Sequence, residues 1–195
     1  MSFTSLNTLQ PLPVCGVILA GGQGSRMGGQ DKGWVVYQQQ PLIKQIINRL
    51  APQVTDLIIN ANRNLEDYSA LGYPVIPDLE AGFHGPLMGI LSGLKASTQE
   101  WTLFVPCDGP FVPKDLALRL YQAATEQACD IAVASDGEHL QPVVALLRTS
   151  LFQQLQQAIA KGETKPRRWY AKVGSCKVEF SSQSLKNFNK LDDML

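Results

Sequence analysis

Residues 14–33 read VCGVILAGGQGSRMGGQDKG, a short apolar run that passes directly into a loop rich in glycine. The run over 14–20 is continuous and β-branched, which predicts a strand buried on both faces. Glycines after such a strand let the backbone adopt positive φ angles and approach a ligand closely. Converging loop amides form a concavity for anions. With Arg26 and Lys32 in the loop, the stretch predicts a polyphosphate site.

The length and charge of the chain restrict the class of protein. It has 195 residues, with 17 basic and 17 acidic side chains, so there is no overall basic field. This balance argues against a general nucleic-acid or membrane-surface binder. No apolar run approaches the roughly 20 residues of a membrane span, and the start of the chain lacks the basic residues of a signal peptide. We expect a cytoplasmic protein of one domain over 1–195, with 1–13 as a loose tail.

Four cysteines stand at positions 15, 107, 129 and 176. No two of them form a CxxC pair, so zinc and dithiol redox sites are disfavoured. We expect reduced thiols, packed in or near the core of a cytosolic protein.

Apolar runs and amphipathic segments alternate along the chain after the glycine loop. This alternation predicts an α/β fold with a mostly parallel sheet, and the turn at Asp136-Gly137 predicts one hairpin that makes the sheet mixed. Gly89 and Gly93, four residues apart on an apolar helix, favour close packing of that helix on the sheet. We expect strands at 14–20, 55–60, 73–76, 101–105, 130–135, 142–147 and 176–180, an extended segment at 34–37, and helices at 41–50, 65–71, 87–96, 113–127, 150–161 and 165–172.

Polar side chains stand where three of these strands end: Asn60, Asp78 and Asp108. Ligands of open α/β sheets bind outside the carboxyl ends of the strands, so these side chains are expected in one crevice. Asp108 follows five apolar residues, where an unpaired carboxylate is costly. A Mg²⁺ ion would compensate this charge, whereas the alternative is an Asp that caps a turn. Asp78 has the same two interpretations, and Asn60 alone fits a turn residue.

Two common phosphate-binding motifs do not match this sequence. A Walker loop requires GxxxxGK[ST], but Lys32 is followed by Gly33. The dinucleotide fingerprint GxGxxG fits Gly22 and Gly24, but Met27 takes the place of the third glycine. What remains is a strand, a glycine turn and two cations. This arrangement suits a triphosphate whose α-phosphate reacts while the cations hold the leaving pyrophosphate.

Several short motifs occur together and in order over nearly the whole chain from residue 14. They are LAGGxGxRMGGxDK at 19–32, NANR at 60–63, GPLxG at 85–89, PCDxP at 106–110, QP at 141–142 and NxN at 187–189. The set resembles the molybdenum cofactor guanylyltransferase family, within the GT-A-like nucleotidyltransferases. Gln141 departs from it, because histidine is common there.

The resemblance implies a three-layer, Rossmann-like fold and a GTP site. It also implies Mg²⁺, or Mn²⁺ in its place, as the metal, and molybdopterin or Mo-molybdopterin as the acceptor. Molybdenum-insertion proteins and molybdoenzyme chaperones would be further partners. The implied site residues are Leu19, Ala20, Gly21 and Gly22 beside the nucleotide, Arg26 and Lys32 on its phosphates, Asn60 and Asp78 in nucleotide binding, Asp108 on the metal, and Asn187 and Asn189 on the pterin side.

The resulting hypothesis is transfer of GMP from GTP to the terminal phosphate of molybdopterin, with release of pyrophosphate. Lys165, Arg167 and Arg168 are candidates for holding the acceptor phosphate, and the alternative for them is a solvated basic face. Two other functions stay open: the same chemistry with CTP or a sugar-phosphate acceptor, and a non-catalytic nucleotide-binding module.

Overall fold

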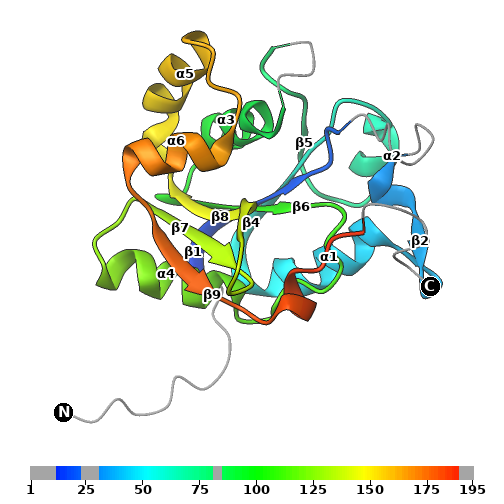
Figure 1. Ribbon diagram of the computed structural model, residues 1–195. Helices are drawn as coiled ribbons and strands as arrows, with labels where there is room; N and C mark the ends of the chain where they lie inside the picture. Colours follow the sequence, from blue (N-terminus) through cyan, green and yellow to red (C-terminus); the bar gives the residue numbers. More distant parts are fainter. Residues whose placement is uncertain (1–11, 23–30, 81–84, 189–195) are drawn as a thin grey trace.

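A computed structural model of the protein describes residues 12–22, 31–80 and 85–188. At its centre lies a seven-stranded sheet with the strand order β5-β4-β1-β6-β8-β7-β9 (Figure 1). The strands are β1 (Leu12–Leu19), β4 (Val54–Asn60), β5 (Val75–Ile76), β6 (Trp101–Pro106), β7 (Ile131–Ser135), β8 (Leu140–Arg148) and β9 (Cys176–Glu179). A separate two-stranded ribbon is formed by β2 (Val36–Tyr37) and β3 (Gln40–Pro41).

Pairing in the sheet is parallel except at one strand. The pairs β5/β4, β4/β1, β1/β6 and β7/β9 are parallel, whereas β8 runs antiparallel to both β6 and β7. The reversal arises because β7 and β8 are joined by a short turn around Gly137, which has a φ of 98°. The predicted mostly parallel, mixed sheet with one hairpin is therefore confirmed.

Helices cover both faces of the sheet and create two apolar cores (Figure 1). Side chains of α1 and α4 fill the core on one face, and side chains of α3, α5 and α6 fill the core on the other. No helix in the described residues is long and apolar enough to cross a membrane. The helices are α1 (Leu42–Leu50), α2 (Leu65–Ser69), α3 (Pro86–Ala96), α4 (Leu116–Glu126), α5 (Phe152–Ala160) and α6 (Pro166–Val173), with 3₁₀ turns at Lys32–Trp34, Ala51–Gln53, Thr149–Leu151 and Ser182–Leu185.

The two glycines of α3 lie against the sheet, as the sequence predicts. A Cβ atom on Gly93 would stand 2.5 Å from Phe104 Cε1 and 3.1 Å from Val17 Cγ2. On Gly89 it would stand 2.6 Å from Asn60 Oδ1. All three distances are below van der Waals contact, so a larger residue at either position would collide with side chains of β1, β4 or β6.

Some boundaries differ from the sequence-based expectation. Strand β1 begins at Leu12, two residues before the expected start, and α4 begins at Leu116 rather than at Pro113. The segment expected to be extended over 34–37 begins instead with a 3₁₀ turn at Lys32–Trp34. This turn forms because the side chain of Asp31 accepts a hydrogen bond from the backbone amide of Gly33.

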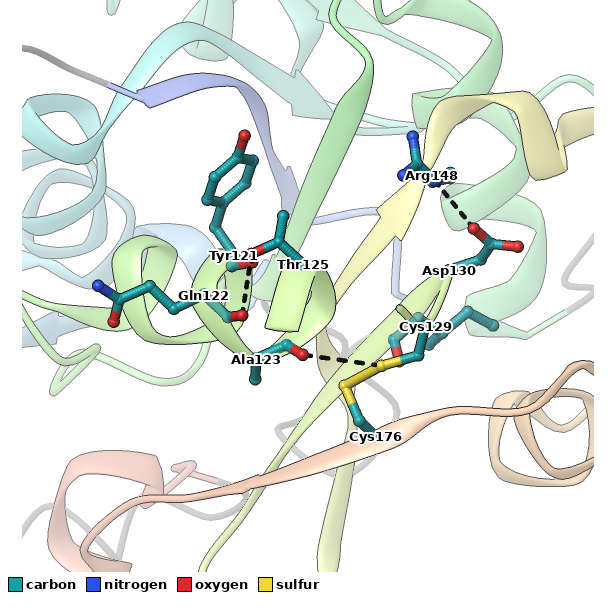
Figure 2. The surroundings of a disulfide bond; sticks show 9 residues. Tyr121, Gln122, Ala123, Thr125, Cys129, Asp130, Arg148 and Cys176 are labelled. Atoms are coloured by element: carbon teal, nitrogen blue, oxygen red, sulfur yellow. Dashed lines mark hydrogen bonds and ion pairs between the residues drawn. A yellow bond between two sulfur atoms is a disulfide. The ribbon is translucent and has the colours of Figure 1, made fainter. Parts of the chain in front are cut away.

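The expectation of four reduced thiols is wrong for two of the cysteines. Cys129, after α4, and Cys176, at the start of β9, form a disulfide across a sequence separation of 47 (Figure 2). The parallel pairing of β7 with β9, which aligns Ala132 with Cys176, brings them together. Cys15 and Cys107 are free and buried, and burial raises the pKa of the Cys15 thiol to about 11.

Candidate functional site

The register of the parallel strands places the candidate residues at one edge of the sheet. Leu19, the last residue of β1, is aligned with Asn60 of β4 on one side and with Pro106 of β6 on the other. Asn60 is in turn aligned with Ile76 of β5. Asp78 and Asp108 each follow the last residue of their strand by two positions. The carboxyl edge predicted as a crevice therefore carries these residues in neighbouring strands.

Lys32 and Asp108 form an ion pair at this edge. Lys32 Nζ lies 2.7 Å from Asp108 Oδ2, although 76 residues separate them. Their side chains are 22% and 12% exposed, so the pair is partly desolvated but not closed off. The second carboxylate oxygen, Asp108 Oδ1, is buried and has no hydrogen-bond partner among the described residues. Such an oxygen is costly unless a ligand satisfies it, and a cation would do so.

The donor set around Asp108 fits a metal that binds together with a nucleotide. Mg²⁺ is often held by one or two carboxylates plus substrate phosphates. The described residues contain no group of three or more His, Cys, Asp or Glu side chains that could hold a metal by themselves. Asp108 Oδ1 therefore fits an ion that takes its other ligands from phosphates and water.

Asp78 lies in a second polar cluster, in which its two oxygens are both occupied. Asn60 Nδ2 donates to Asp78 Oδ1 at 3.0 Å, and Asn62 Nδ2 donates to Asp78 Oδ2 at 2.8 Å. The backbone amide of Asp78 donates back to Asn62 Oδ1 at 2.8 Å. Asp78 thus fixes the orientation of two asparagine side chains.

The Asp78 cluster reaches the start of the glycine-rich loop. Asn62 Nδ2 also donates to the carbonyl of Gly21 at 3.2 Å. A Cβ atom on Gly21 would stand 2.8 Å from Asn62 Nδ2 and 3.4 Å from Asn60 Oδ1. Glycine at this position therefore lets the loop backbone lie directly against the two asparagines.

A third polar cluster surrounds Asp31 at the other end of the loop. Its side chain is 5% exposed and accepts hydrogen bonds from Tyr68 Oη at 2.6 Å, Asn64 Nδ2 at 2.9 Å and the Gly33 amide at 3.2 Å. Arg63 Nε lies 3.8 Å from Asp31 Oδ2. Burial raises the pKa of the Tyr68 hydroxyl far above its ordinary value, so at neutral pH the hydroxyl keeps its proton and donates a hydrogen bond to Asp31.

Sequence reasoning did not identify Asp31, Asn62, Asn64 or Tyr68 as site residues. Asp31 and Asn62 fall inside two of the motifs, which was the available signal. Asn64 and Tyr68 follow the NANR motif and carry no pattern of their own. Their roles become visible only where the loop and α2 meet.

The last described segment of the chain lies beside Asp108. The amide of Phe188 donates to the carbonyl of Asp108 at 2.8 Å. A Cβ atom on Gly109 would stand 2.9 Å from Asn187 Oδ1. The structure thus brings Asn187 to the Asp108–Gly109 turn, whereas Asn189 and Arg26 lie outside the described residues.

The basic stretch at 165–168 is divided between two environments. Arg168 Nε donates to both oxygens of Glu163, at 2.9 and 3.0 Å, and Lys172 Nζ donates to the same carboxylate at 2.9 Å. These hydrogen bonds, led by the one from Arg168, lower the pKa of Glu163 from 4.5 to about 2. The side chains of Lys165, Arg167 and Arg168 are all exposed, but Arg168 is engaged by a protein carboxylate.

Known proteins resemble this chain in sequence and in structure. Residues 16–177 match the MobA-like NTP transferase domain family. Molybdenum cofactor guanylyltransferases from Shewanella putrefaciens and Pasteurella multocida are 43% and 45% identical over 185 and 180 residues. The matches cover 94% and 91% of this chain and 95% of each relative.

Similarity to a solved structure extends the comparison to the fold. The crystal structure of molybdopterin-guanine dinucleotide biosynthesis protein A from Archaeoglobus fulgidus is 22% identical, with a TM-score of 0.75. The match covers 92% of this chain and 94% of the Archaeoglobus fulgidus chain. The expected Rossmann-like nucleotidyltransferase fold is thereby confirmed.

Proposed function

The chain belongs to the MobA-like NTP transferase family, and from that premise we propose that it is a molybdenum cofactor guanylyltransferase. It transfers GMP from GTP to the terminal phosphate of molybdopterin or Mo-molybdopterin, forms the guanine dinucleotide form of the molybdenum cofactor and releases pyrophosphate. The observation that carries the proposal is the similarity, over most of both chains, to relatives with this name.

The site residues have separate parts in this reaction. The oxygen of the acceptor phosphate is already ionised near neutral pH, so the protein does not have to supply a general base. Catalysis then consists of positioning and of stabilising the charge that develops on the leaving pyrophosphate. We assign the second task to Lys32, together with Arg26. Leu19, Ala20, Gly21 and Gly22, with Asn60 and Asp78, are assigned to the nucleotide.

A Mg²⁺ ion, or Mn²⁺ in its place, is part of the proposal. Asp108 would hold it through Oδ1, the buried oxygen without a partner among the described residues. When bound, the ion would supply neutralisation of phosphate charge. Lys32 donates a hydrogen bond to the other oxygen of the same carboxylate and so fixes its orientation.

The proposal also names the residues on the acceptor side and the protein partners. Asn187, beside the Asp108–Gly109 turn, is assigned to the pterin side, together with Asn189. Molybdenum-insertion proteins would supply the substrate, and molybdoenzyme chaperones would receive the product.

We propose a cytoplasmic location, although a disulfide is uncommon in that compartment. Cell fractionation tests the location, and recovery with secreted proteins would contradict it.

The experiment that tests the function measures pyrophosphate release by the full chain with molybdopterin and Mg²⁺. GTP, CTP, ATP and UTP are supplied one at a time. We expect turnover with GTP and formation of a molybdopterin–GMP product detectable by mass spectrometry. Activity confined to CTP would replace the guanylyl transfer with cytidylyl transfer. Nucleotide binding without any turnover would favour the non-catalytic alternative.

A further inference from the structure

We propose that Asn62, Asn64 and Tyr68 are positioning residues that hold both ends of the phosphate-binding loop and so place Lys32 on Asp108. These three residues are called the loop clamp below. They lie in one short segment, which runs from the end of β4 into α2. This inference rests on the proposed function, because it names the residues that position Lys32 for binding a nucleoside triphosphate.

The first end of the loop is held by Asn62. Its Nδ2 donates to the carbonyl of Gly21, directly after β1. Asn62 is itself fixed by Asp78, which accepts from Nδ2 at 2.8 Å and donates its amide to Oδ1 at 2.8 Å. The asparagine side chain is thus bonded at both of its ends before it contacts the loop.

The second end is held by Asn64 and Tyr68 through Asp31. The two side chains donate to different oxygens of the Asp31 carboxylate, at 2.9 and 2.6 Å. Asp31 immediately precedes Lys32 in the chain, so its position determines where the lysine side chain starts. Hydrogen bonds to a charged group are among the stronger ones in proteins.

Two residues of this arrangement, Gly33 and Asn64, have unusual local structure. A Cβ atom on Gly33 would stand 2.4 Å from Tyr68 Oη, so only glycine leaves room for the tyrosine hydroxyl at Asp31. Asn64 has a left-handed backbone, with a φ of 52°, and stands at the N-cap of α2. Its side chain makes no cap hydrogen bond, although asparagine is a preferred N-cap residue. The hydrogen bond that its side chain does make is the one from Nδ2 to Asp31.

The Asp31 carboxylate would be a poor choice if it served stability alone. Replacing buried ionic groups by apolar residues is often neutral or stabilising. Here the buried carboxylate, at the residue next to Lys32, accepts hydrogen bonds from Asn64 and Tyr68 and forms an ion pair with Arg63. On the other side, Lys32 Nζ is bonded to Asp108. The lysine is therefore fixed at its backbone by the loop clamp and at its tip by the carboxylate assigned to the metal.

Two single substitutions test the proposal with little change in packing. Tyr68→Phe removes the hydroxyl and keeps the ring, which lies 5.3 Å from the Trp34 ring, centroid to centroid. Asn64→Gly removes the amide and keeps a residue that tolerates positive φ. For each variant we expect GTP affinity and kcat/KM for GTP to fall about tenfold, the scale of one lost hydrogen bond to a charged group. The KM for molybdopterin should stay within about twofold, because the clamp acts on the nucleotide side.

Matched controls separate positioning from stability. Tyr170→Phe removes another fully buried tyrosine hydroxyl, one that donates to the carbonyl of Pro142 at 2.9 Å. Asp67→Asn changes an exposed residue of α2 itself. Both controls should keep GTP affinity within about twofold, and Tyr170→Phe should lower the melting temperature about as much as Tyr68→Phe does.

A double-mutant cycle tests whether Tyr68 affects GTP affinity through Lys32. In a Lys32→Met background, Tyr68→Phe should cause no further loss of GTP affinity, because the clamp then has no lysine to place. Full additivity of the two losses would overturn the proposal, as would a Tyr68→Phe protein with unchanged GTP affinity and kinetics. If the wild-type chain binds GTP but does not turn over with molybdopterin, the proposed function fails and the binding cycle still decides the clamp. A wild-type chain that binds none of the four nucleotides overturns both.

Discussion

Asp78 and Asp108 stand in equivalent places in the sheet, yet their carboxylates have different surroundings. Each follows its strand by two residues, one after β5 and one after β6. Both oxygens of Asp78 accept from asparagine amides, whereas Asp108 has one oxygen on Lys32 and one buried oxygen without a partner among the described residues. Asp78 can organise the asparagines around it, whereas Asp108 keeps an oxygen that no described residue occupies and that is available to a cation.

The largest effect is expected at Asp108. Asp108→Asn should lower kcat for pyrophosphate release about 10³-fold or more, because a bound metal contributes several kcal/mol of charge stabilisation. The amide is nearly isosteric but neutral, so it neither pairs with Lys32 nor holds Mg²⁺. The rate is measured at saturating GTP, molybdopterin and Mg²⁺, with Asp115→Asn as an exposed control. Unchanged turnover would show that the assigned metal role is wrong.

Removal of the cation on the same carboxylate should have the next largest effect. Lys32→Met should lower kcat about 10²-fold, the usual cost of losing one charge-stabilising donor in an active site. It should also weaken GTP binding, because a phosphate partner is lost. Lys44→Met, at an exposed position of α1, serves as the control. If the two lysine variants behaved alike, the Lys32–Asp108 pair would be structural only.

A smaller effect is expected at Asp78, and it tests the comparison directly. Asp78→Asn should lower kcat/KM for GTP about tenfold, because one new NH₂ group faces an asparagine amide that is also a donor. The loss should appear mainly in KM. The Mg²⁺ concentration that gives half-maximal rate should match that of the wild type, and a marked rise would mean that Asp78 also serves the metal.

Glu163 is a third carboxylate for comparison, and its oxygens accept from Arg168 and Lys172 rather than from amides. Its replacement should change the stability of the fold. Its pKa is lowered from 4.5 in the ordinary state to about 2 in the fold, so its contribution is present above about pH 4.5 and is lost as the pH falls towards 2. Glu163→Gln should therefore melt at a lower temperature than the wild type at pH 7. Melting curves between pH 7 and pH 2 should show the difference shrinking, whereas a constant difference would contradict the assigned cause.

The sequence predicts well what depends on local patterns and on the rules of parallel sheets. The alternation of strands and helices, the hairpin around Gly137 and the close packing of Gly93 on the sheet are all confirmed. Asn60, Asp78 and Asp108 lie at the predicted edge because parallel strands end on the same side. These features follow from residues close together in the chain or from a general rule of topology.

What the sequence does not reveal depends on distant residues meeting at a given register. The contact of Lys32 with Asp108 spans 76 residues, and that of Tyr68 with Asp31 spans 37. No periodicity or spacing encodes such contacts, since a shift of one residue in a strand would break them. The pairing of Cys129 with Cys176 was missed for the same reason, because it depends on β9 joining the sheet beside β7.

The Cys129–Cys176 bond turns the chain between these residues into a closed covalent ring. The ring contains the exposed β7–β8 turn, where a protease has ready access. A single cut at that turn would leave two pieces joined through sulfur. They would migrate as one band in a denaturing gel until a reductant separates them.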